Sequence, residues 1–168
     1  MRNALVTGGS RGIGKAISEK LAMDGFHVLI NYSSDKEKAS ETKQRIQDLN
    51  GSCELIRFDV SDASQVENSL AGWAEKNRDS YIEVLVNNAG VTRDQLMLWM
   101  KKEDWSTVID INLNGFFFVS RIVLKDMLAR KRGRIINIAS LSGQKGHIFS
   151  VPAMSRSKSG FFHLSFLK

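Results

Sequence analysis

A glycine-rich segment directly after the first apolar run constrains the fold of this chain more than any other feature. Residues 4–6 are Ala-Leu-Val, and residues 7–14 read Thr-Gly-Gly-Ser-Arg-Gly-Ile-Gly. A short strand that turns on glycines into a helix is the layout of a dinucleotide-phosphate site, because free N–H groups at a helix start favour anions. Gly8 permits the tight turn, Gly12 lets the backbone approach a pyrophosphate, and Gly14 lets the helix pack against the strand. Glycines after a strand are often only a turn, so the segment favours a phosphate site and leaves the simpler interpretation open.

Apolar runs and helical periodicities alternate along the chain, with no internal repeat and no linker. The apolar runs predict strands at residues 4–7, 26–30, 53–58, 82–86 and 135–138. Periodicity and cap residues predict helices at residues 13–25, 34–51, 64–76 and 104–129. Ser34 and Glu37 indicate a capping box for the second helix, and the third is expected to bury Val66, Leu70 and Trp73. Apolar strands that alternate with helices predict an α/β fold, a doubly wound parallel sheet that is Rossmann-like.

The composition is that of one ordinary folded domain. The chain has 168 residues, of which 42% are hydrophobic and 25% charged, enough to bury a core. Its single cysteine, Cys53, lies in a predicted strand and is expected to be a buried thiol in a reducing compartment. No apolar run approaches the roughly 20 residues of a membrane span, and the N-terminus enters a strand without a signal-peptide pattern. We therefore expect a cytoplasmic protein that has no membrane partner.

The net charge of +6 suggests nucleic-acid binding until the basic residues are located along the chain. Residues 127–168 contain eight basic residues and no acidic one, which leaves 16 basic against 18 acidic residues in the first 126. The positive excess thus lies in a C-terminal segment that mixes its charges with phenylalanines and has no binding motif. The sequence therefore argues against a nucleic-acid partner.

Further motifs show which family the chain resembles. The glycines are spaced Gly8-x3-Gly12-x-Gly14, and downstream follow Asn87-Asn-Ala-Gly90, Asn112 and Ile138-Ala-Ser140. The chain thereby resembles the short-chain dehydrogenases/reductases, and residues 7–14, 85–91 and 133–143 are most similar to 3-oxoacyl-[acyl-carrier-protein] reductases. The resemblance runs to about residue 143 and then decays. Residues 1–143 are therefore expected to form a dinucleotide-binding Rossmann-like domain, and residues 144–168 a divergent tail of the same domain.

The resemblance implies a nicotinamide cofactor at the carboxyl ends of the strands. Asn31-Tyr-Ser-Ser stands where a carboxylate would hold the ribose 2′-hydroxyl of NAD, and Arg11 can meet a 2′-phosphate. NADP (NADPH) is therefore expected rather than NAD, although Arg11 is also open to being a solvated loop charge. Asp59 resembles the position that meets the adenine, and it is equally open to being a helix-capping acid. The implied cofactor residues are Thr7, Gly8, Ser10, Arg11, Gly12, Ile13, Gly14, Asn31, Asp59, Val60, Asn87, Ala89 and Gly90.

The resemblance also implies a catalytic group, of which one member is missing. Ser140 resembles the serine that holds the substrate oxygen, and Asn112 the asparagine whose carbonyl binds a relay water. Lys158 resembles the family lysine, and it is also open to being merely a basic residue of the tail. The family's proton donor is a tyrosine four residues before that lysine, but this chain has Met154 there, and methionine cannot donate a proton. Both tyrosines of the chain precede Ser140, and no metal is implied.

The chain ends where the family has its next helix, so the sheet is expected to be incomplete on its C-terminal side. A reading-frame change near Gly146, a truncation and a true short variant are three explanations that the sequence leaves open. Three functions then compete. The first is an NADPH-dependent 3-oxoacyl reductase, homo-oligomeric in the family, whose acidic acyl carrier protein could meet Lys131, Arg132 and Arg134. The others are a catalytically silent NADP-binding protein and a non-functional remnant; we favour the first by ancestry and expect its activity to be impaired.

Overall fold

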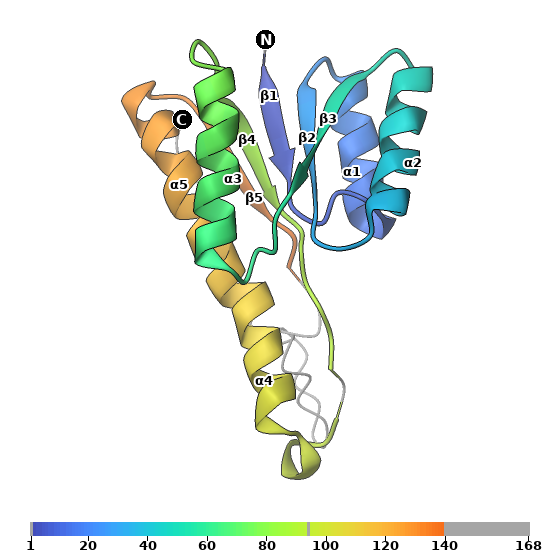
Figure 1. The fold of residues 1–168 in the computed structure, drawn as a ribbon, viewed down its shortest axis with the longest axis vertical. Helices are drawn as coiled ribbons and strands as arrows, with labels where there is room; N and C mark the ends of the chain where they lie inside the picture. Colours follow the sequence, from blue (N-terminus) through green and yellow to red (C-terminus); the bar gives the residue numbers. More distant parts are fainter. Residues whose placement is uncertain (1, 94, 140–168) are drawn as a thin grey trace.

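The computed structural model describes residues 2–93 and 95–139, which form one sheet between two layers of helices (Figure 1). All strand pairs in it are parallel, and the strand order is β3-β2-β1-β4-β5. The strands are β1 (Asn3–Val6), β2 (His27–Tyr32), β3 (Ser52–Arg57), β4 (Ile82–Asn87) and β5 (Arg134–Asn137). The doubly wound α/β fold expected from the alternating pattern is thus confirmed, and the described chain ends just after the fifth strand.

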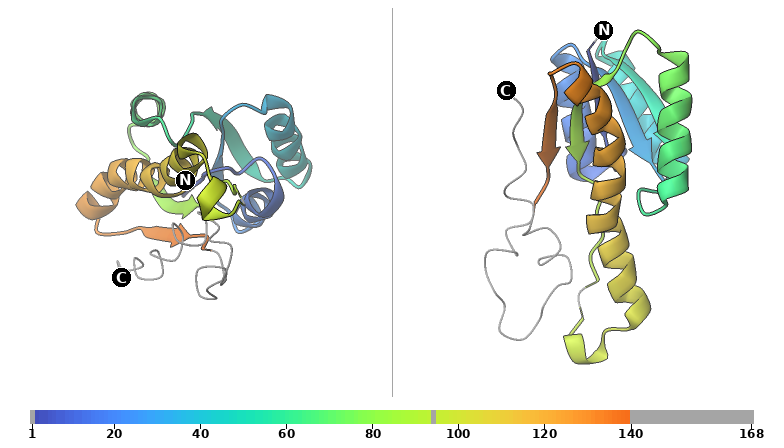
Figure 2. Two further views of the ribbon diagram at one scale, coloured as in Figure 1. Left: turned by 90° about the horizontal axis from the view of Figure 1, so that it is seen from below. Right: turned by 90° about the vertical axis from the view of Figure 1, so that its left-hand side faces the viewer.

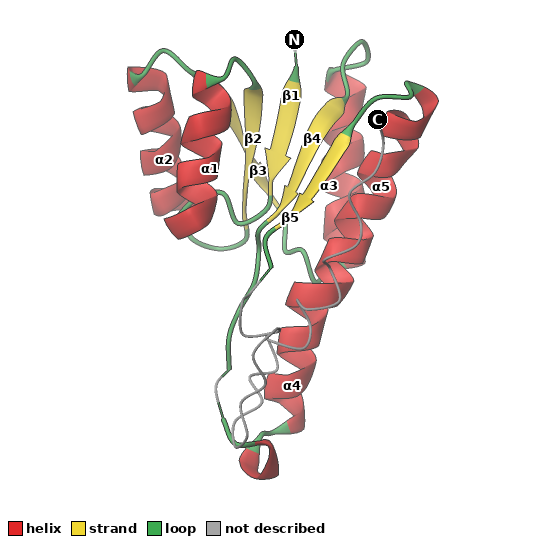
Figure 3. Cartoon of the chain, turned by 180° about the vertical axis from the view of Figure 1, so that it is seen from behind, coloured by secondary structure: helices red, strands yellow, loops and turns green. Residues whose placement is uncertain are grey.

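The helices divide between the two faces of the sheet, as Figure 3 shows from behind. One face carries α1 (Gly12–Met23) and α2 (Lys36–Asp48), and the other carries α3 (Ala63–Lys76) and α5 (Gly115–Ala129). A further helix, α4 (Lys102–Ile109), continues into α5 through a π-helical turn, η2 (Asp110–Asn114), and follows the short 3₁₀ turn η1 (Met97–Trp99). Helix α4 projects beyond the carboxyl ends of the strands (Figure 2).

Alternate residues of the central strand enter two separate cores. Leu5 packs with residues of α3 and α5, whereas Ala4 and Val6 pack with residues of α1 and α2. Because side chains alternate across a strand, a strand covered on both faces must be apolar at nearly every position, which explains the unbroken apolar runs in the sequence. Val66, Leu70 and Trp73 form the buried face of α3, as their spacing predicts. Cys53 is buried as well, and this burial raises the pKa of its thiol.

The predicted element boundaries need small corrections. Most strands and helices begin or end within one or two residues of the predicted position. The N-cap of α2 is Asp35 rather than Ser34, because the Asp35 carboxylate accepts the N–H of Lys38 at 3.0 Å. The predicted helix at 104–129 begins at Lys102 and contains the π-helical turn, which the periodicity did not indicate. A π-helical turn inside a longer helix is frequent at functional sites.

The described residues include one helix, Lys102–Ala129, that is long and apolar enough to cross a membrane. An 18-residue window of it has a mean hydropathy of 1.4, which the sequence-based expectation of no such segment overlooked. A third of that window is buried, and Val119, Val123 and Met127 lie in the core beside α3 and the sheet. This packing explains the apolar residues on the buried side of the helix, whereas Leu113, Phe117 and Leu128 are exposed. One such helix is weak evidence for a membrane span, because core helices of soluble proteins meet the same criterion.

A charge cluster joins three parts of the chain at the amino ends of the strands. Glu83 of β4 accepts hydrogen bonds from Arg2, at 2.8 Å from Nη2, and from Arg132, at 3.2 Å from Nε. The Glu83 side chain is only 11% exposed, so these bonds form in a partly dehydrated setting. Arg2 also stacks on the ring of Phe26, 4.2 Å from its centroid. The hydrogen bond from Arg2, with a smaller contribution from Arg132, lowers the pKa of Glu83.

The substitution Glu83→Gln should lower the free energy of unfolding at pH 7 by about 1–3 kcal/mol, because it removes the charge that two guanidinium groups share. A carboxyl whose pKa is lowered by folding stabilises the protein above its unfolded pKa, and that contribution is lost as the pH falls through the folded pKa. Urea unfolding of both proteins should therefore show a difference that shrinks in acid. Glu75→Gln, on the exposed side of α3, is the control and should change stability by less than about 0.5 kcal/mol. Equal stability of Glu83→Gln and the original chain at pH 7 would contradict the prediction.

Candidate functional site

A groove lies at the carboxyl ends of the strands, where the strand order reverses on either side of β1. Its cavity volume is about 460 Å³, within the range of small-molecule sites. The loops after β1, β2, β3 and β4 all contribute to its lining. The predicted cofactor residues that line it are Gly8, Ser10, Arg11, Gly12, Ile13, Gly14, Asn31, Asp59, Val60, Ala89 and Gly90. Thr7 and Asn87, which were predicted with them, line a smaller neighbouring cavity instead.

The glycine turn has the backbone geometry that its sequence predicts. Gly8 and Gly12 have φ values of 61° and 53°, the left-handed region that favours glycine. A Cβ atom on Gly12 would meet nothing within 4 Å, so this position opens toward the groove. The first turn of α1 follows at once and contains no acidic residue. A helix start with free N–H groups and no nearby carboxylate of its own suits the phosphate groups of a dinucleotide.

Gly14 is needed for a different contact from the expected one. A Cβ atom at this position would lie 2.2 Å from the carbonyl oxygen of Gly8 and 2.5 Å from Nδ2 of Asn88. The helix therefore packs closely against the glycine turn and the loop after β4, rather than against the strand itself. Only a residue without a side chain leaves room for these two neighbours.

Thr7 and Asn88 join the loop after β1 to the loop after β4. The hydroxyl oxygen of Thr7 accepts the N–H groups of Asn88 and Ala89, both at 3.0 Å. In return, Nδ2 of Asn88 donates to the carbonyl oxygens of Thr7 and Gly8, at 3.0 and 3.1 Å. Sequence reasoning proposed a cofactor role for the neighbours of Asn88 but gave Asn88 itself no role. Its position inside Asn87-Asn-Ala-Gly90 was the available signal.

Asn31 uses its side chain inside the protein. Its Oδ1 accepts the N–H of Gly8 at 3.1 Å, and its Nδ2 donates to the carbonyl oxygens of Phe58 and Ile56. The residue is 2% exposed, so it lines the groove while its amide fixes the glycine turn to the ends of β2 and β3. This arrangement leaves the nearby Ser33 and Ser34 as the exposed residues that follow β2 in the groove.

Asp59 lies in the groove, and the alternative that it caps a helix is wrong. The N-cap of α3 is Asp62, whose carboxylate accepts the N–H groups of Ser64 and Gln65. The hydrogen bond from Gln65 is the main reason why the pKa of Asp62 is lowered. Asp59 instead accepts both the N–H and the hydroxyl of Ser61, at 2.9 and 2.6 Å, which holds its carboxylate at the wall of the groove.

Asn112 occupies the π-helical turn and is only 3% exposed. Its Oδ1 accepts the N–H of Val91 at 2.9 Å, and its Nδ2 donates to the carbonyl oxygen of Val91 at 3.0 Å. Both hydrogen-bonding groups of the amide thus hold the segment that follows β4. An asparagine in a helix costs helix propensity, and this paired contact with the backbone is what it provides here.

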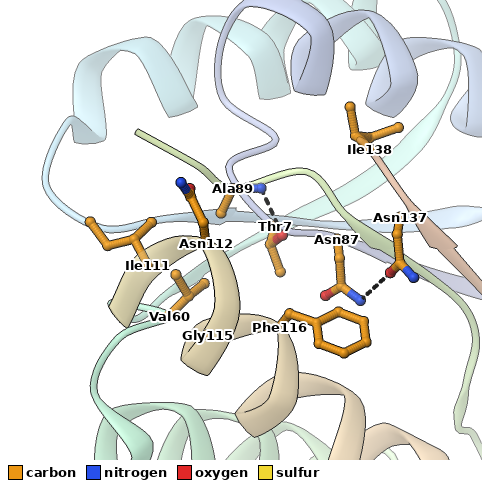
Figure 4. Close-up of a pocket in the computed structure, with 10 residues that line it drawn as sticks. All are labelled: Thr7, Val60, Asn87, Ala89, Ile111, Asn112, Gly115, Phe116, Asn137 and Ile138. Carbon is orange, nitrogen blue, oxygen red and sulfur yellow. Dashed lines mark hydrogen bonds between the residues drawn. The ribbon is translucent and has the colours of Figure 1, made fainter. Parts of the chain in front are cut away.

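A small cavity beside Asn112 lies between the groove, with which it shares Val60, Ala89 and Ile111, and β5 (Figure 4). Its volume is about 10 Å³, at the lower limit for one water molecule. Asn87 donates from Nδ2 to Oδ1 of Asn137 at 3.0 Å and to the hydroxyl of Ser120 at 3.1 Å. The bond to Asn137 fixes the end of β5, three residues before Ser140 in the sequence. Ser140 and Lys158, the other two predicted catalytic residues, lie outside the described residues, as do Met154 and the tail. In residues 2–93 and 95–139 no three His, Cys, Asp or Glu side chains are grouped as a metal site.

Comparison with known proteins identifies the family of this fold and groove. A family model described as short chain dehydrogenase matches residues 2–166. The chain belongs to the short-chain dehydrogenase family. The match extends past residue 143, where the resemblance was expected to decay, and the separation of a divergent tail at that point stays a prediction.

Curated members of the family confirm the resemblance to 3-oxoacyl-[acyl-carrier-protein] reductases. A protein of that name from Synechocystis sp. is 45% identical over 144 residues, which is 86% of this chain and 58% of that protein. Another, FabG from Staphylococcus aureus, is 39% identical over 146 residues, 87% of this chain and 58% of that protein. The chain therefore spans somewhat more than half the length of these two relatives. A solved gluconate 5-dehydrogenase from Burkholderia cenocepacia, in complex with NADP and tartrate, has a TM-score of 0.84 at 32% identity and covers 94% of this chain and 60% of its own.

The substitution Gly14→Ala should destabilise the protein by about 1–3 kcal/mol, because its Cβ would overlap Gly8 and Asn88 and force the two loops apart. Gly72→Ala in α3 is the matched control, since a Cβ there meets nothing within 4 Å. That control should be neutral or stabilising by up to about 1 kcal/mol, through helix propensity. Thermal or urea unfolding of both variants measures the difference. Equal unfolding midpoints of the two variants would show that the contact at Gly14 is unimportant.

Proposed function

We propose that this chain is an NADPH-dependent reductase of the 3-oxoacyl-[acyl-carrier-protein] type, which reduces a 3-oxoacyl thioester to the 3-hydroxyacyl thioester in the cytoplasm. The observation that carries the proposal is the groove at the strand-order reversal, with the open glycine turn and the start of α1 at its wall. Ligands of open parallel sheets bind at this place. The curated relatives with this name and the NADP-bound family member support the proposal.

The charges around the loop after β2 support NADPH rather than NADH. The carboxylate that lines the groove beside this loop belongs to Asp35. It already accepts the N–H of Lys38 at the start of α2. That hydrogen bond is the main cause of the lowered pKa of Asp35. Lys38 also lies 3.5 Å from the same carboxylate, so little negative charge is left for a ribose hydroxyl. Arg11 lines the same groove, interacts electrostatically with Asp35 and would meet a 2′-phosphate.

The residues of the chain take separate roles in the proposed reaction. Bound in the groove, the cofactor supplies the hydride. Ser140, just beyond β5 in the sequence, would hold the oxygen of the substrate carbonyl. Lys158 would keep the phenol of a proton-donating tyrosine acidic where such a tyrosine is present. Asn112 keeps its position through its two bonds to Val91 and would hold the relay water by its carbonyl. The network of Asn87 with β5 fixes the strand that leads to Ser140.

Met154 is the reason to keep a second candidate function. The sequence has no tyrosine after Tyr81, so nothing in it occupies the proton donor's place before Lys158. Loss of a general acid costs about 10²- to 10⁴-fold in rate. A catalytically silent NADP-binding protein therefore fits the same residues, because it needs only the groove. We propose that residues 1–143 supply this nucleotide-binding part.

The acidic acyl carrier protein would meet the basic turn that ends α5. Lys131 is exposed there, and Arg132 lies 3.1 Å from Glu83, which Arg2 also contacts. Two guanidinium groups share one carboxylate, so this cluster of Arg2, Glu83 and Arg132 keeps one positive charge in excess beside Lys131. Such a surface favours association with an acidic protein mainly through the rate of encounter.

NADPH should raise the melting temperature of the chain, and NADH should do so less at the same concentration. Binding to the folded state alone stabilises it by about 2.7 kcal/mol at a ligand concentration of one hundred times Kd. Arg11→Met should reduce the response to NADPH toward that of NADH. Lys20→Met, on an exposed part of α1 outside the groove, is the control and should respond like the original chain. Equal responses to the two cofactors would remove the role of Arg11, and no response to either would favour a non-functional remnant.

Reduction of an acetoacetyl thioester should be slow with the chain as it stands and faster with Met154→Tyr. The substitution restores a phenol four residues before Lys158 and should raise kcat by at least about tenfold if Lys158 is in register. NADPH absorbance follows the reaction, and Met154→Phe is the matched control that adds the ring without the hydroxyl. Turnover of the original chain at about 10 per second or more would contradict the proposed impairment.

A further inference from the structure

One arginine near the groove has no role in the family resemblance and holds the turn that lines the proposed 2′-phosphate end. Nε of Arg57 donates to the carbonyl oxygen of Ser33 at 3.1 Å. Ser33, Ser34 and Asp35 line the groove, whereas Arg57 does not. Arg57 therefore acts on the groove through the turn between β2 and α2, from behind it.

The backbone of Arg57 is fixed on two sides, which makes its side chain a firm support. Arg57 lies opposite Tyr32 in the pairing of β2 with β3, and the next residue donates its N–H to the carbonyl of Tyr32 at 3.1 Å. The hydroxyl of Ser69, from α3, donates to the carbonyl oxygen of Arg57 at 3.0 Å. A side chain that starts from a fixed backbone loses less conformational entropy when it forms its own hydrogen bond.

Arg57 also adds positive charge to this corner. Within the described part of the chain, no carboxylate lies within ion-pair distance of Arg57 or of Arg11. The turn of Ser33 and Ser34 thus has Arg11 on the groove side and Arg57 on the sheet side. Neutral hydroxyls between two cations suit a dianionic phosphate ester better than a ribose hydroxyl.

We propose that Arg57 is a positioning residue that sets the preference of the groove for a 2′-phosphorylated adenosine nucleotide, by holding the carbonyl of Ser33 and so the Ser33–Ser34 turn. The inference rests on the nucleotide-binding function proposed above. It concerns one end of the ligand, so it can be tested with fragments that carry no nicotinamide and undergo no reaction.

The probes are adenosine 2′,5′-bisphosphate (2′,5′-ADP) and adenosine 5′-monophosphate (5′-AMP), which share the adenosine and the 5′-phosphate and differ only in the 2′-phosphate. Calorimetric titration gives the Kd of each for the original chain, Arg57→Met and Arg57→Lys. Arg57→Met should weaken the binding of 2′,5′-ADP by about two- to tenfold, the worth of one hydrogen bond, and change the binding of 5′-AMP by less than about twofold. Arg57→Lys keeps the charge but lacks Nε, so it should recover only part of the lost preference. Arg78→Met removes an exposed arginine outside the groove and is the control, with both affinities unchanged.

The outcomes separate this inference from the function on which it rests. If the original chain prefers 2′,5′-ADP and Arg57→Met keeps the same preference, Arg57 has no positioning role. Full recovery by Arg57→Lys would mean that only the charge matters, which also overturns the inference. If the original chain binds neither probe, the proposed nucleotide function fails and this inference fails with it. Melting temperatures without ligand show that the variants are folded, as expected for an exposed side chain.

Discussion

The groove depends on a close approach between two loops that lie far apart in the sequence. Gly14 brings α1 so near to the turn after β1 and to Asn88 after β4 that no side chain fits between them. Four hydrogen bonds then join Thr7 and Gly8 to Asn88 and Ala89, and they fix the two loops against each other. Because β1 and β4 are neighbours in the sheet, this link lies where the strand order reverses. Gly12, in the same turn, has open space beside it at the start of α1.

The sequence predicts what local chemistry determines and misses what distant partners determine. The two-sided burial of β1 forces an apolar run, and positive φ at Gly8 and Gly12 forces glycines, so both were visible. The partner of Asn88 is 81 residues away, which no local pattern encodes. Ser34 and Asp35 are both good N-caps by residue type, and only the structure shows that the carboxylate of Asp35 accepts the N–H of Lys38. Helix propensity marked Asn112 as unusual, but the π-helical turn became visible only with its contacts to Val91.

Asn112 and Asn87 join the nucleotide groove to the part of the chain where the family resemblance places catalysis. Asn112 holds Val91, which lines the groove, and Asn87 holds the end of β5, which leads to Ser140. Asn87 and Asn112 both line the small cavity between the groove and β5 (Figure 4). A buried amide that satisfies two backbone groups is costly to move, because each lost bond leaves a polar group without a partner. The nucleotide groove and the end of β5 therefore meet at one small cavity, and the residue at that strand end, Asn137, is three positions before Ser140 in the sequence.

Arginine side chains lie at both ends of the sheet, but their surroundings differ. At the amino ends of the strands, Arg2 and Arg132 both form ion pairs with the carboxylate of Glu83. At the carboxyl ends, Arg11 and Arg57 have no described carboxylate in ion-pair range, and the free N–H groups of α1 point into the same groove. The carboxylates of Asp35 and Asp59 also line this groove, but Asp35 accepts a hydrogen bond from Lys38 and Asp59 accepts two from Ser61. A bound anion would therefore find Arg11 and the helix N–H groups available at the carboxyl end, whereas Arg2 and Arg132 are already paired with a carboxylate at the amino end.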